Sequence, residues 1–196
     1  MSVSDLENRL NNVRLSAEAA ETFVEWYYRC LNEGKPVAGA YTTNNRAYKA
    51  ANHPPSDICI NGLVVATPEE WDKMLEGQRS IKTIDPTSTH AHPTTISTVS
   101  HRGAVRYDVE AYDVHVINPD FRIGAPAELL AKPNQGPRLM MLLTVAGKVV
   151  FNGGAEQKKQ HFSDVFTLVP NWDVIARHGS KATRRYLISS HTYRAY

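Results

Sequence analysis

The side chains most suited to acid–base chemistry lie within residues 105–116, where apolar and polar residues alternate as in a β-strand. They are Asp108, Glu110, Tyr112 and His115. Asp108 and Glu110 alternate with Tyr107 and Val109, so carboxylates and apolar side chains point to opposite faces. If the apolar side chains face the core, the carboxylates face solvent or a partner. The pattern therefore favours a polar surface over a catalytic site.

Two histidines have the spacing of a metal-binding pair. His90 and His92, in the segment THAHPT, would present two ring nitrogens on one side of a strand. A structural metal needs further ligands, and the sequence offers no convincing third one. Pro86 and Pro93 flank the pair and favour a loop. Motifs for a nucleophilic serine or a phosphate loop are also absent, so the sequence predicts no catalytic residue, no metal site and no cofactor.

Basic residues gather near the end of the chain. The net charge of the whole chain is only +2, but residues 138–196 are markedly basic. The basic residues around the last two predicted strands are Lys158, Lys159, Arg177, Lys181, Arg184 and Arg185. They could form a surface that contacts RNA phosphates or an acidic partner. Ordinary solvated loops explain the same composition, and both interpretations stay open at this point.

Two amphipathic helices must support these residues. One begins at Ser16, which can act as N-cap, and ends before Gly34; residues 1–15 are expected to form a flexible arm or a short helix. The second follows Thr67, where Thr67 and Glu70 have the spacing of a capping box.

Strands dominate from residue 93 onward. In the strand that contains Asp108 the apolar positions shift by one residue, which predicts a β-bulge near residues 111–113. The continuously apolar residues 139–151 predict a strand covered on both faces. Residues 161–169 and 186–196 complete the sheet. Asp164 shares a face with phenylalanines there, so it needs a buried hydrogen-bond partner.

This order of elements predicts an α+β fold in which a cone-shaped, strongly curved antiparallel sheet packs on N-terminal helices. We expect one domain over residues 16–196, interrupted by a long proline-rich insertion at residues 118–138. Two cysteines are too few for a disulfide framework, and neither a membrane span nor a secretory signal is apparent. The composition thus favours the cytosol or the nucleus.

Several segments resemble nuclear transport factor 2-like proteins. They are FVEWYYRCLNEGKP, PPSDICINGLVV, TPEEW, HFSDVFTLVPNWDV and YLISSHTYRAY. Within this family they are most similar to the fungal mRNA transport regulator branch, the small subunits of heterodimeric mRNA export receptors. The resemblance runs from about residue 16 to residue 196. It implies a non-enzymatic adaptor whose sheet packs, by its outer face, against the related domain of the large receptor subunit.

The resemblance also implies partners and a location. Such a heterodimer binds Phe-Gly repeats of nucleoporins and carries mRNA, and in fungi pre-ribosomal subunits, through the nuclear pore. The expected location is therefore the nucleus and the nuclear pore, with shuttling to the cytoplasm. The insertion at residues 118–138 is similar in position and length to a loop linked to RNA or ribosomal cargo.

The last strand supplies the expected interface residues. Strict alternation, together with the family pattern, turns one set toward the partner: Ile188, Ser190, Thr192, Arg194 and Tyr196. The other set, which includes Leu187 and His191, then faces the helices. Arg194 matches the family position that pairs with a partner carboxylate. Without the resemblance, an edge-strand arginine that reaches into water is the simpler interpretation.

Two other functions stay open. The homodimeric Ran-GDP import carriers of this family have an acidic residue where this chain has His191, which weakens that alternative. A small-molecule dehydratase or isomerase on the same cone-shaped fold would need a buried pocket with a His/Asp or Tyr/Asp pair. A pocket filled by Phe, Tyr and Leu side chains would favour the adaptor, and such an adaptor is expected to be poorly soluble without its partner.

Overall fold

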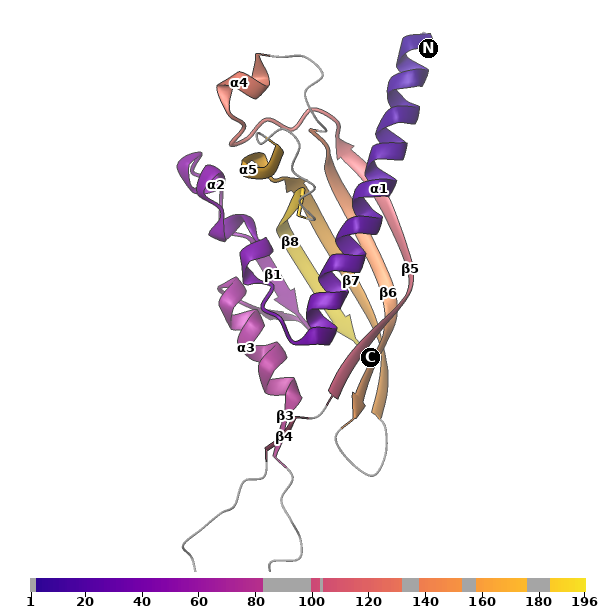
Figure 1. Ribbon diagram of the computed structural model, residues 1–196, viewed down its shortest axis with the longest axis vertical. Helices are drawn as coiled ribbons and strands as arrows, with labels where there is room; N and C mark the ends of the chain where they lie inside the picture. The colour runs from indigo at the N-terminus through magenta and orange to yellow at the C-terminus, as the bar shows by residue number, and fades with distance from the viewer. Residues whose placement is uncertain (1–2, 83–99, 103, 132–137, 153–157, 176–183) are drawn as a thin grey trace, which may run out of the picture.

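The computed structural model describes residues 3–82, 100–102, 104–131, 138–152, 158–175 and 184–196 (Figure 1). The α-helices are α1 (Val3–Glu33), α2 (Arg46–Ala50), α3 (Pro68–Arg79), α4 (Ala127–Leu130) and α5 (Trp172–Ile175), and two 3₁₀ turns span Ala38–Ala40 and Thr42–Asn44. The strands are β1 (Asp57–Ile60), β2 (Leu63–Val64), β3 (Ser80–Lys82), β4 (Ser100–Arg102), β5 (Ala104–Asn118), β6 (Met140–Asn152), β7 (Lys158–Pro170) and β8 (Tyr186–Ala195).

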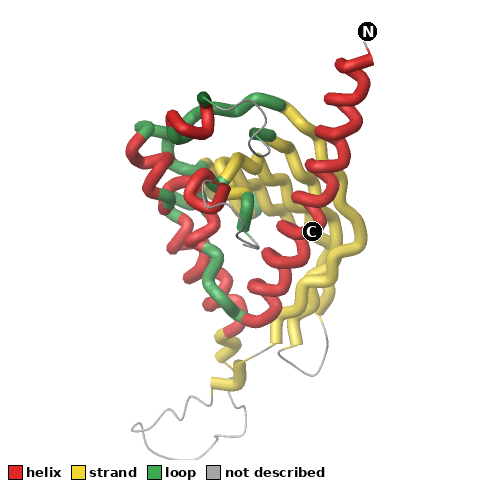
Figure 2. Tube along the Cα trace, turned by 45° about the horizontal axis from the view of Figure 1, so that its top comes forward, coloured by secondary structure: helices red, strands yellow, loops and turns green. Residues whose placement is uncertain are grey.

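Six strands form the main sheet, in the order β2-β1-β8-β7-β6-β5. All neighbours pair antiparallel except β1 and β8, which run parallel. The sheet curves strongly without closing, and α1 and α3 lie against its inner face (Figures 1 and 2). The predicted α+β fold with N-terminal helices on a curved sheet is therefore confirmed. None of the described helices is long and apolar enough to cross a membrane.

Helix α1 is longer than the sequence pattern suggested. It begins at Val3, so Ser16 lies in its interior and the predicted N-cap is wrong. The Ser16 hydroxyl instead donates to the Val13 carbonyl at 2.9 Å, one turn back. At the other end, Gly34 adopts a φ of 70° and the Lys35 N–H donates to the Cys30 carbonyl at 2.9 Å, which is a Schellman-type end.

Helix α3 begins as predicted. The Thr67 hydroxyl accepts a hydrogen bond from the Glu70 N–H at 3.3 Å, while the Glu70 carboxylate accepts from the Ala66 N–H at 3.0 Å. Asp72, one turn later, accepts from the N–H groups of Val37 and Ala38 at 2.8 and 3.0 Å. These bonds join α3 to the segment that leaves α1, so both helices are held together over the sheet.

The bulge in β5 occurs at Glu110, one residue before the predicted range. Val109 pairs with Gly147 and Ala111 pairs with Ala146, so Glu110 has no partner of its own in the register. A Cβ atom on Gly147 would lie 2.2 Å from the Asp108 carbonyl oxygen. The backbones approach so closely at the bulge that only glycine fits opposite it.

The apolar strand β6 is covered by its own chain on one face only. Met141, Leu143 and Val145 are fully buried against the helices. Thr144 and Ala146, which point the other way, are exposed. The main core thus occupies the space between α1, α3 and the inner face of the sheet. No element among the residues that the structure describes covers the centre of the outer face.

Candidate partner-binding surface

A chain of buried polar groups crosses the inner face of the sheet. The Tyr28 hydroxyl donates to Asp164 Oδ2 at 2.6 Å, and Asp164 Oδ1 lies 2.7 Å from His191 Nε2. The other ring nitrogen of His191, Nδ1, lies 2.8 Å from the Tyr41 hydroxyl. All four side chains are at most 3% exposed. These contacts supply the buried hydrogen-bond partners that the sequence predicted for Asp164 without identifying them.

The surroundings of this polar chain are aromatic and tightly filled. The His191 ring stacks on Phe166 with 4.6 Å between ring centroids, and the edges of Tyr27 and Trp71 close on it from other sides. Burial, reinforced by the Asp164 carboxylate, raises the pKa of Tyr28 well above its ordinary value. The surface pockets found along α1 and α3 are lined by neither Asp164 nor His191. Asp164 and His191 are each 1% exposed within this aromatic surround, and their hydrogen bonds join β7 and β8 to Tyr28 of α1 and to Tyr41.

The acid–base candidates of β5 lie away from this network, as the alternation predicted. Asp108 pairs with Arg106 at 2.6 Å, and the Glu110 carboxylate pairs with Lys148. Asp113 pairs with His115 at 3.1 Å, and both side chains are largely exposed. Tyr112 is 44% exposed and follows the bulge, so it shares the face of Val114 next to α1. The carboxylates form ion pairs at the surface and do not converge on a site.

The outer face of the sheet has small side chains at its centre. Aligned across the strands, its middle row consists of Asp113, Thr144, Val165, Thr192 and Cys59. The rows on either side bring together Ala146, Ser163 and Arg194, and Leu142, Thr167 and Ser190. Short side chains of this kind let another flat surface approach the backbone closely. The valine, leucine and alanine side chains in these three rows provide apolar contact area.

One of the predicted interface residues is on the wrong face. Ile188 is fully buried in the chain's own core, next to Leu168. The pairing shifts there, because Leu168 aligns with Ile188 whereas Thr167 aligns with Ser190. This irregularity leaves Ser189 as an extra residue and reverses the alternation. Two successive serines carry no apolar signal, so the sequence pattern could not reveal the shift.

The other predicted interface residues do lie on the outer face. Ser190 and Thr192 are half-buried and Arg194 is exposed. Arg194 makes no ion pair with any residue that the structure describes. Tyr196 is 74% exposed and its ring stacks on His161, while the two backbones exchange hydrogen bonds of 2.9 and 3.0 Å. Strand β8 is thus an interior strand, held by β1 and β7.

The four basic residues that the structure describes, Lys158, Lys159, Arg184 and Arg185, do not form one surface. The register of β7 with β8 puts Lys158 and Lys159 beside the carboxyl end of β8, and Arg184 and Arg185 at its amino end. Strand β7 is 13 residues long. At a rise of about 3.3 Å per residue, the two groups lie roughly 40 Å apart. Arg184 lies over the ring of Trp26, 5.4 Å from its centroid. Contact of these residues with RNA stays a prediction.

Some predicted residues fall outside the described part of the chain. Arg177 and Lys181 lie outside the described residues, as do His90 and His92. Among the residues that are described, no group of three or more histidine, cysteine or acidic side chains is placed to hold a metal ion.

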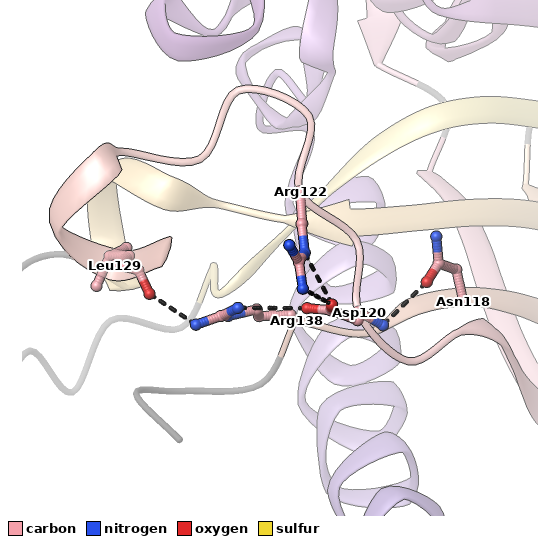
Figure 3. Close-up of polar contacts among 5 residues, drawn as sticks. All are labelled: Asn118, Asp120, Arg122, Leu129 and Arg138. Atoms are coloured by element: carbon pink, nitrogen blue, oxygen red, sulfur yellow. Dashed lines mark hydrogen bonds and ion pairs between the residues drawn. The ribbon is translucent and has the colours of Figure 1, made fainter. Parts of the chain in front are cut away.

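The first half of the insertion is folded against the body of the protein (Figure 3). Arg122 donates to Asp120 Oδ2 through Nε at 2.8 Å, and Arg138 reaches Asp120 Oδ1 at 3.3 Å and the Leu129 carbonyl at 2.6 Å. The Asp120 N–H donates to the Asn118 side chain at 2.9 Å. The Arg122 hydrogen bond lowers the pKa of Asp120, with a further contribution from Arg138. Sequence reasoning missed this network, whose widest contact joins Asp120 to Arg138, 18 positions apart.

Apolar contacts anchor the same segment. Phe121 and Leu129 are buried in a second, smaller cluster with Tyr48, Trp172 and neighbouring side chains. The Trp172 ring N–H donates to the Ile123 carbonyl at 2.8 Å. The described part of the insertion, residues 118–131, is therefore anchored at one end of the sheet, at the end where Arg184 and Arg185 precede β8.

Comparisons with known proteins agree with this geometry. The chain is 50% identical to a chain of the complex of Mex67 and Mtr2 with a Sac3N peptide, over 92% of this chain and 99% of that one, with a TM-score of 0.74. It is 49% identical to a chain of the complex of the Chaetomium thermophilum Mex67 NTF2-like domain with Mtr2, over 92% and 98%, with a TM-score of 0.75. A structure of Mtr2 matches at 50% identity over 92% and 99%, also with a TM-score of 0.75. No family model matches the chain, and a search of curated proteins found no match.

Proposed function

Since the chain belongs to the Mtr2 family of nuclear transport factor 2-like proteins, we propose that it is the small subunit of a heterodimeric mRNA export receptor. The large subunit would contribute a related NTF2-like domain that packs on the outer face of the sheet. A solved structure shows the Chaetomium thermophilum Mex67 NTF2-like domain in complex with Mtr2. The proposed role is that of an adaptor without enzymatic activity, in the nucleus and at the nuclear pore, from which it shuttles to the cytoplasm.

The observation that carries this proposal is the contrast between a filled inner face and an open outer face. The outer face joins Thr144, Val165 and Thr192 in one row across three strands. Beside this row Arg194 has a guanidinium group without an ion-pair partner among the described residues. A partner carboxylate could accept two parallel hydrogen bonds from it.

The cargo and the pore contacts belong to the same proposal. The heterodimer would bind Phe-Gly nucleoporins and carry mRNA and pre-ribosomal subunits. The relative in complex with a Sac3N peptide supports peptide binding by the heterodimer. The insertion at residues 118–138, within a domain of residues 16–196, would contact RNA or ribosomal cargo together with Arg184 and Arg185.

Pairing through the outer face is tested by placing charge at its centre. In Thr144→Glu with Val165→Glu, two cross-strand neighbours would bring unpaired carboxylates into the interface. We expect the affinity for the NTF2-like domain of the large subunit to fall by about 100-fold or more in a titration of the purified domains. Ala51→Glu, at an exposed position outside the sheet, is the control that should bind normally. Unchanged affinity of the double variant would rule out this face as the interface.

Contact with RNA is tested separately. Reversing both basic residues, Arg184→Glu and Arg185→Glu, should weaken RNA binding by the heterodimer and make it less sensitive to salt, because fewer counterions are released. The measurement is RNA affinity against salt concentration. The control is Lys158→Glu with Lys159→Glu, at the opposite end of the sheet. It shows whether the loss of RNA affinity is specific to the end of the sheet that carries the insertion. An unchanged salt slope in the Arg184/Arg185 variant would remove these residues from the RNA-binding surface.

A further inference from the structure

The first half of α1 carries a row of exposed apolar side chains. Val3, Leu6, Leu10 and Val13 are 76%, 46%, 62% and 64% exposed. Their spacing of three, four and three residues puts them on one side of the helix, as the a and d positions of a heptad repeat. This part of α1 extends past the end of the sheet (Figures 1 and 2). No element among the described residues covers it.

The exposed row continues the buried face of the same helix. The heptad positions that follow are Ala17, Ala20, Val24, Tyr27 and Leu31. Of these, the last four are buried against the sheet. One apolar seam thus runs the length of α1, and the chain itself covers only its second half. A helical segment of about 12 residues has little stability in water without packing on its apolar side.

We propose that the uncovered seam, Val3, Leu6, Leu10 and Val13, docks an amphipathic helix of another protein that carries acidic residues beside its own apolar seam. Such a helix would insert its apolar side chains between those of α1. The positions that flank the seam carry Glu7, Arg9 and Arg14. Acidic side chains opposite the two arginines would fix the choice and direction of the partner helix.

The flanking charges argue against a second copy of this chain as the occupant. In a parallel pair, Arg9 of one helix would face Arg14 of the other. In the antiparallel pair that overlaps all four apolar residues, Arg9 would face Arg9 and Glu7 would face Glu7. Like charges meet in both arrangements. A stable dimer also buries about 20 residues a side, far more than this seam supplies.

The existing ion pair of Arg14 is weak enough to allow this contact. Arg14 pairs with Glu18 at 3.6 Å, but both side chains are more than 60% exposed, so the pair contributes little and can rearrange. The seam leads into a groove between α1 and β5, lined in part by Ala17, Tyr112 and Val114. Because α1 covers the inner face of the sheet, a helix docked here leaves the outer face free. The site is therefore separate from the interface in the proposed function.

The test uses two synthetic helical peptides of three heptads, with valine and leucine at the a and d positions and either glutamate or lysine at e and g. Binding to the purified heterodimer is followed by fluorescence anisotropy. We expect the glutamate peptide to bind at least about 5-fold more tightly than the lysine peptide at low salt, and the difference to shrink as salt screens the charges. Leu6→Ser with Leu10→Ser should reduce binding of the glutamate peptide by about 10-fold or more. Asn8→Ser, on the opposite side of the helix, should not.

A charge reversal gives a result that does not depend on the packing of the seam. Arg9→Glu with Arg14→Glu should invert the preference toward the lysine peptide, while circular dichroism shows the helix content unchanged. Equal binding of both peptides, or no effect of the Leu6 and Leu10 substitutions, would overturn the proposal. So would sedimentation showing that two heterodimers associate through Leu6 and Leu10, since a second copy would then be the occupant.

Discussion

The two faces of the sheet use the same kinds of polar residue for different purposes. On the inner face, Asp164 and His191 are 1% exposed and each has two hydrogen-bond partners enclosed by aromatic rings. On the outer side, Asp113 and His115 form a similar pair at 3.1 Å that is more than 70% exposed. Residue type and pairing are alike, and burial alone separates them. An Asp–His pair is therefore no evidence of catalysis until its access to a substrate is known.

The difference in burial between the two faces also explains why the outer face is the one available to a partner. A buried polar network specifies a single arrangement of the core, because each group left unpaired there would cost free energy. The outer face has no such network across β6, β7 and β8; its centre is made of serine, threonine, alanine and valine side chains. A surface of this kind can be covered by another sheet without desolvating many charges.

Removal of the central carboxylate should have the largest effect on the free energy of unfolding. Asp164→Ala leaves the Tyr28 hydroxyl and the His191 ring without their shared partner in the core. We expect a loss of about 3–5 kcal/mol, measured by urea unfolding. The matched change Asp113→Ala on the exposed pair should stay within about 0.5 kcal/mol. Equal effects of the two substitutions would contradict the distinction between the faces.

Arg194 provides the corresponding experiment on the outer face. Arg194→Ala should lower the affinity for the large subunit by about 2 kcal/mol or more, since the partner's carboxylate would be left buried and unpaired. Arg194→Lys should recover little of this loss, because an ammonium group cannot form the two parallel hydrogen bonds. The stability of the chain alone should not change. Full binding by Arg194→Lys would show that only the charge matters at this position.

Tyr28→Phe should have a smaller effect at neutral pH, about 1.5–3 kcal/mol, because it removes one hydrogen bond to a carboxylate. The folded chain raises the pKa of Tyr28, so this residue stabilises the fold fully below the pKa of the unfolded chain, near 10. That stabilisation is lost as the pH rises further, when the unfolded chain ionises first. Urea unfolding between pH 9 and 11 should show a steeper fall for the unsubstituted chain than for Tyr28→Phe. Identical pH profiles for the two proteins would assign the loss of stability at alkaline pH to other tyrosines.

The smallest effect is expected in the insertion. The pKa of Asp120 is lowered, so its pairing with Arg122 and Arg138 stabilises this segment above the pKa of the unfolded carboxyl, near 4, and is lost as the pH falls through the lower folded value. The carboxylate is half exposed, which keeps the contribution below about 1 kcal/mol. Fluorescence of Trp172, whose ring N–H bonds to Ile123, should report an acid transition that Asp120→Asn removes. A transition that persists in Asp120→Asn would assign it to another group.

Local signals were the most reliable guide to the fold. Thr67 and Glu70 located the start of α3, and the shift in apolar phase located the β5 bulge to within one residue. The same kind of signal misplaced the start of α1, since Ser16 has the chemistry of an N-cap but lies in a longer helix. The sequence placed Ile188 on the wrong face of the sheet. The face on which it lies is set by a shift in the pairing of β8 with β7, and the residues next to Ile188 in the chain carry no sign of that shift.

The sequence by itself determined the class of the fold and the helices that cover one face of the sheet, because hydrophobic periodicity and capping act between residues close together in the chain. The family was indicated by resemblance to known proteins and shown by the comparisons. Only the tertiary structure decided that Asp164 meets Tyr28 and His191. It also decided that Lys158 and Lys159 lie at the opposite end of the sheet from Arg184 and Arg185, and that no described element covers the first half of the α1 seam. These features depend on which strands become neighbours and in what register. The contacts of Asp164 join residues 27 and 136 positions apart, and no local pattern specifies them.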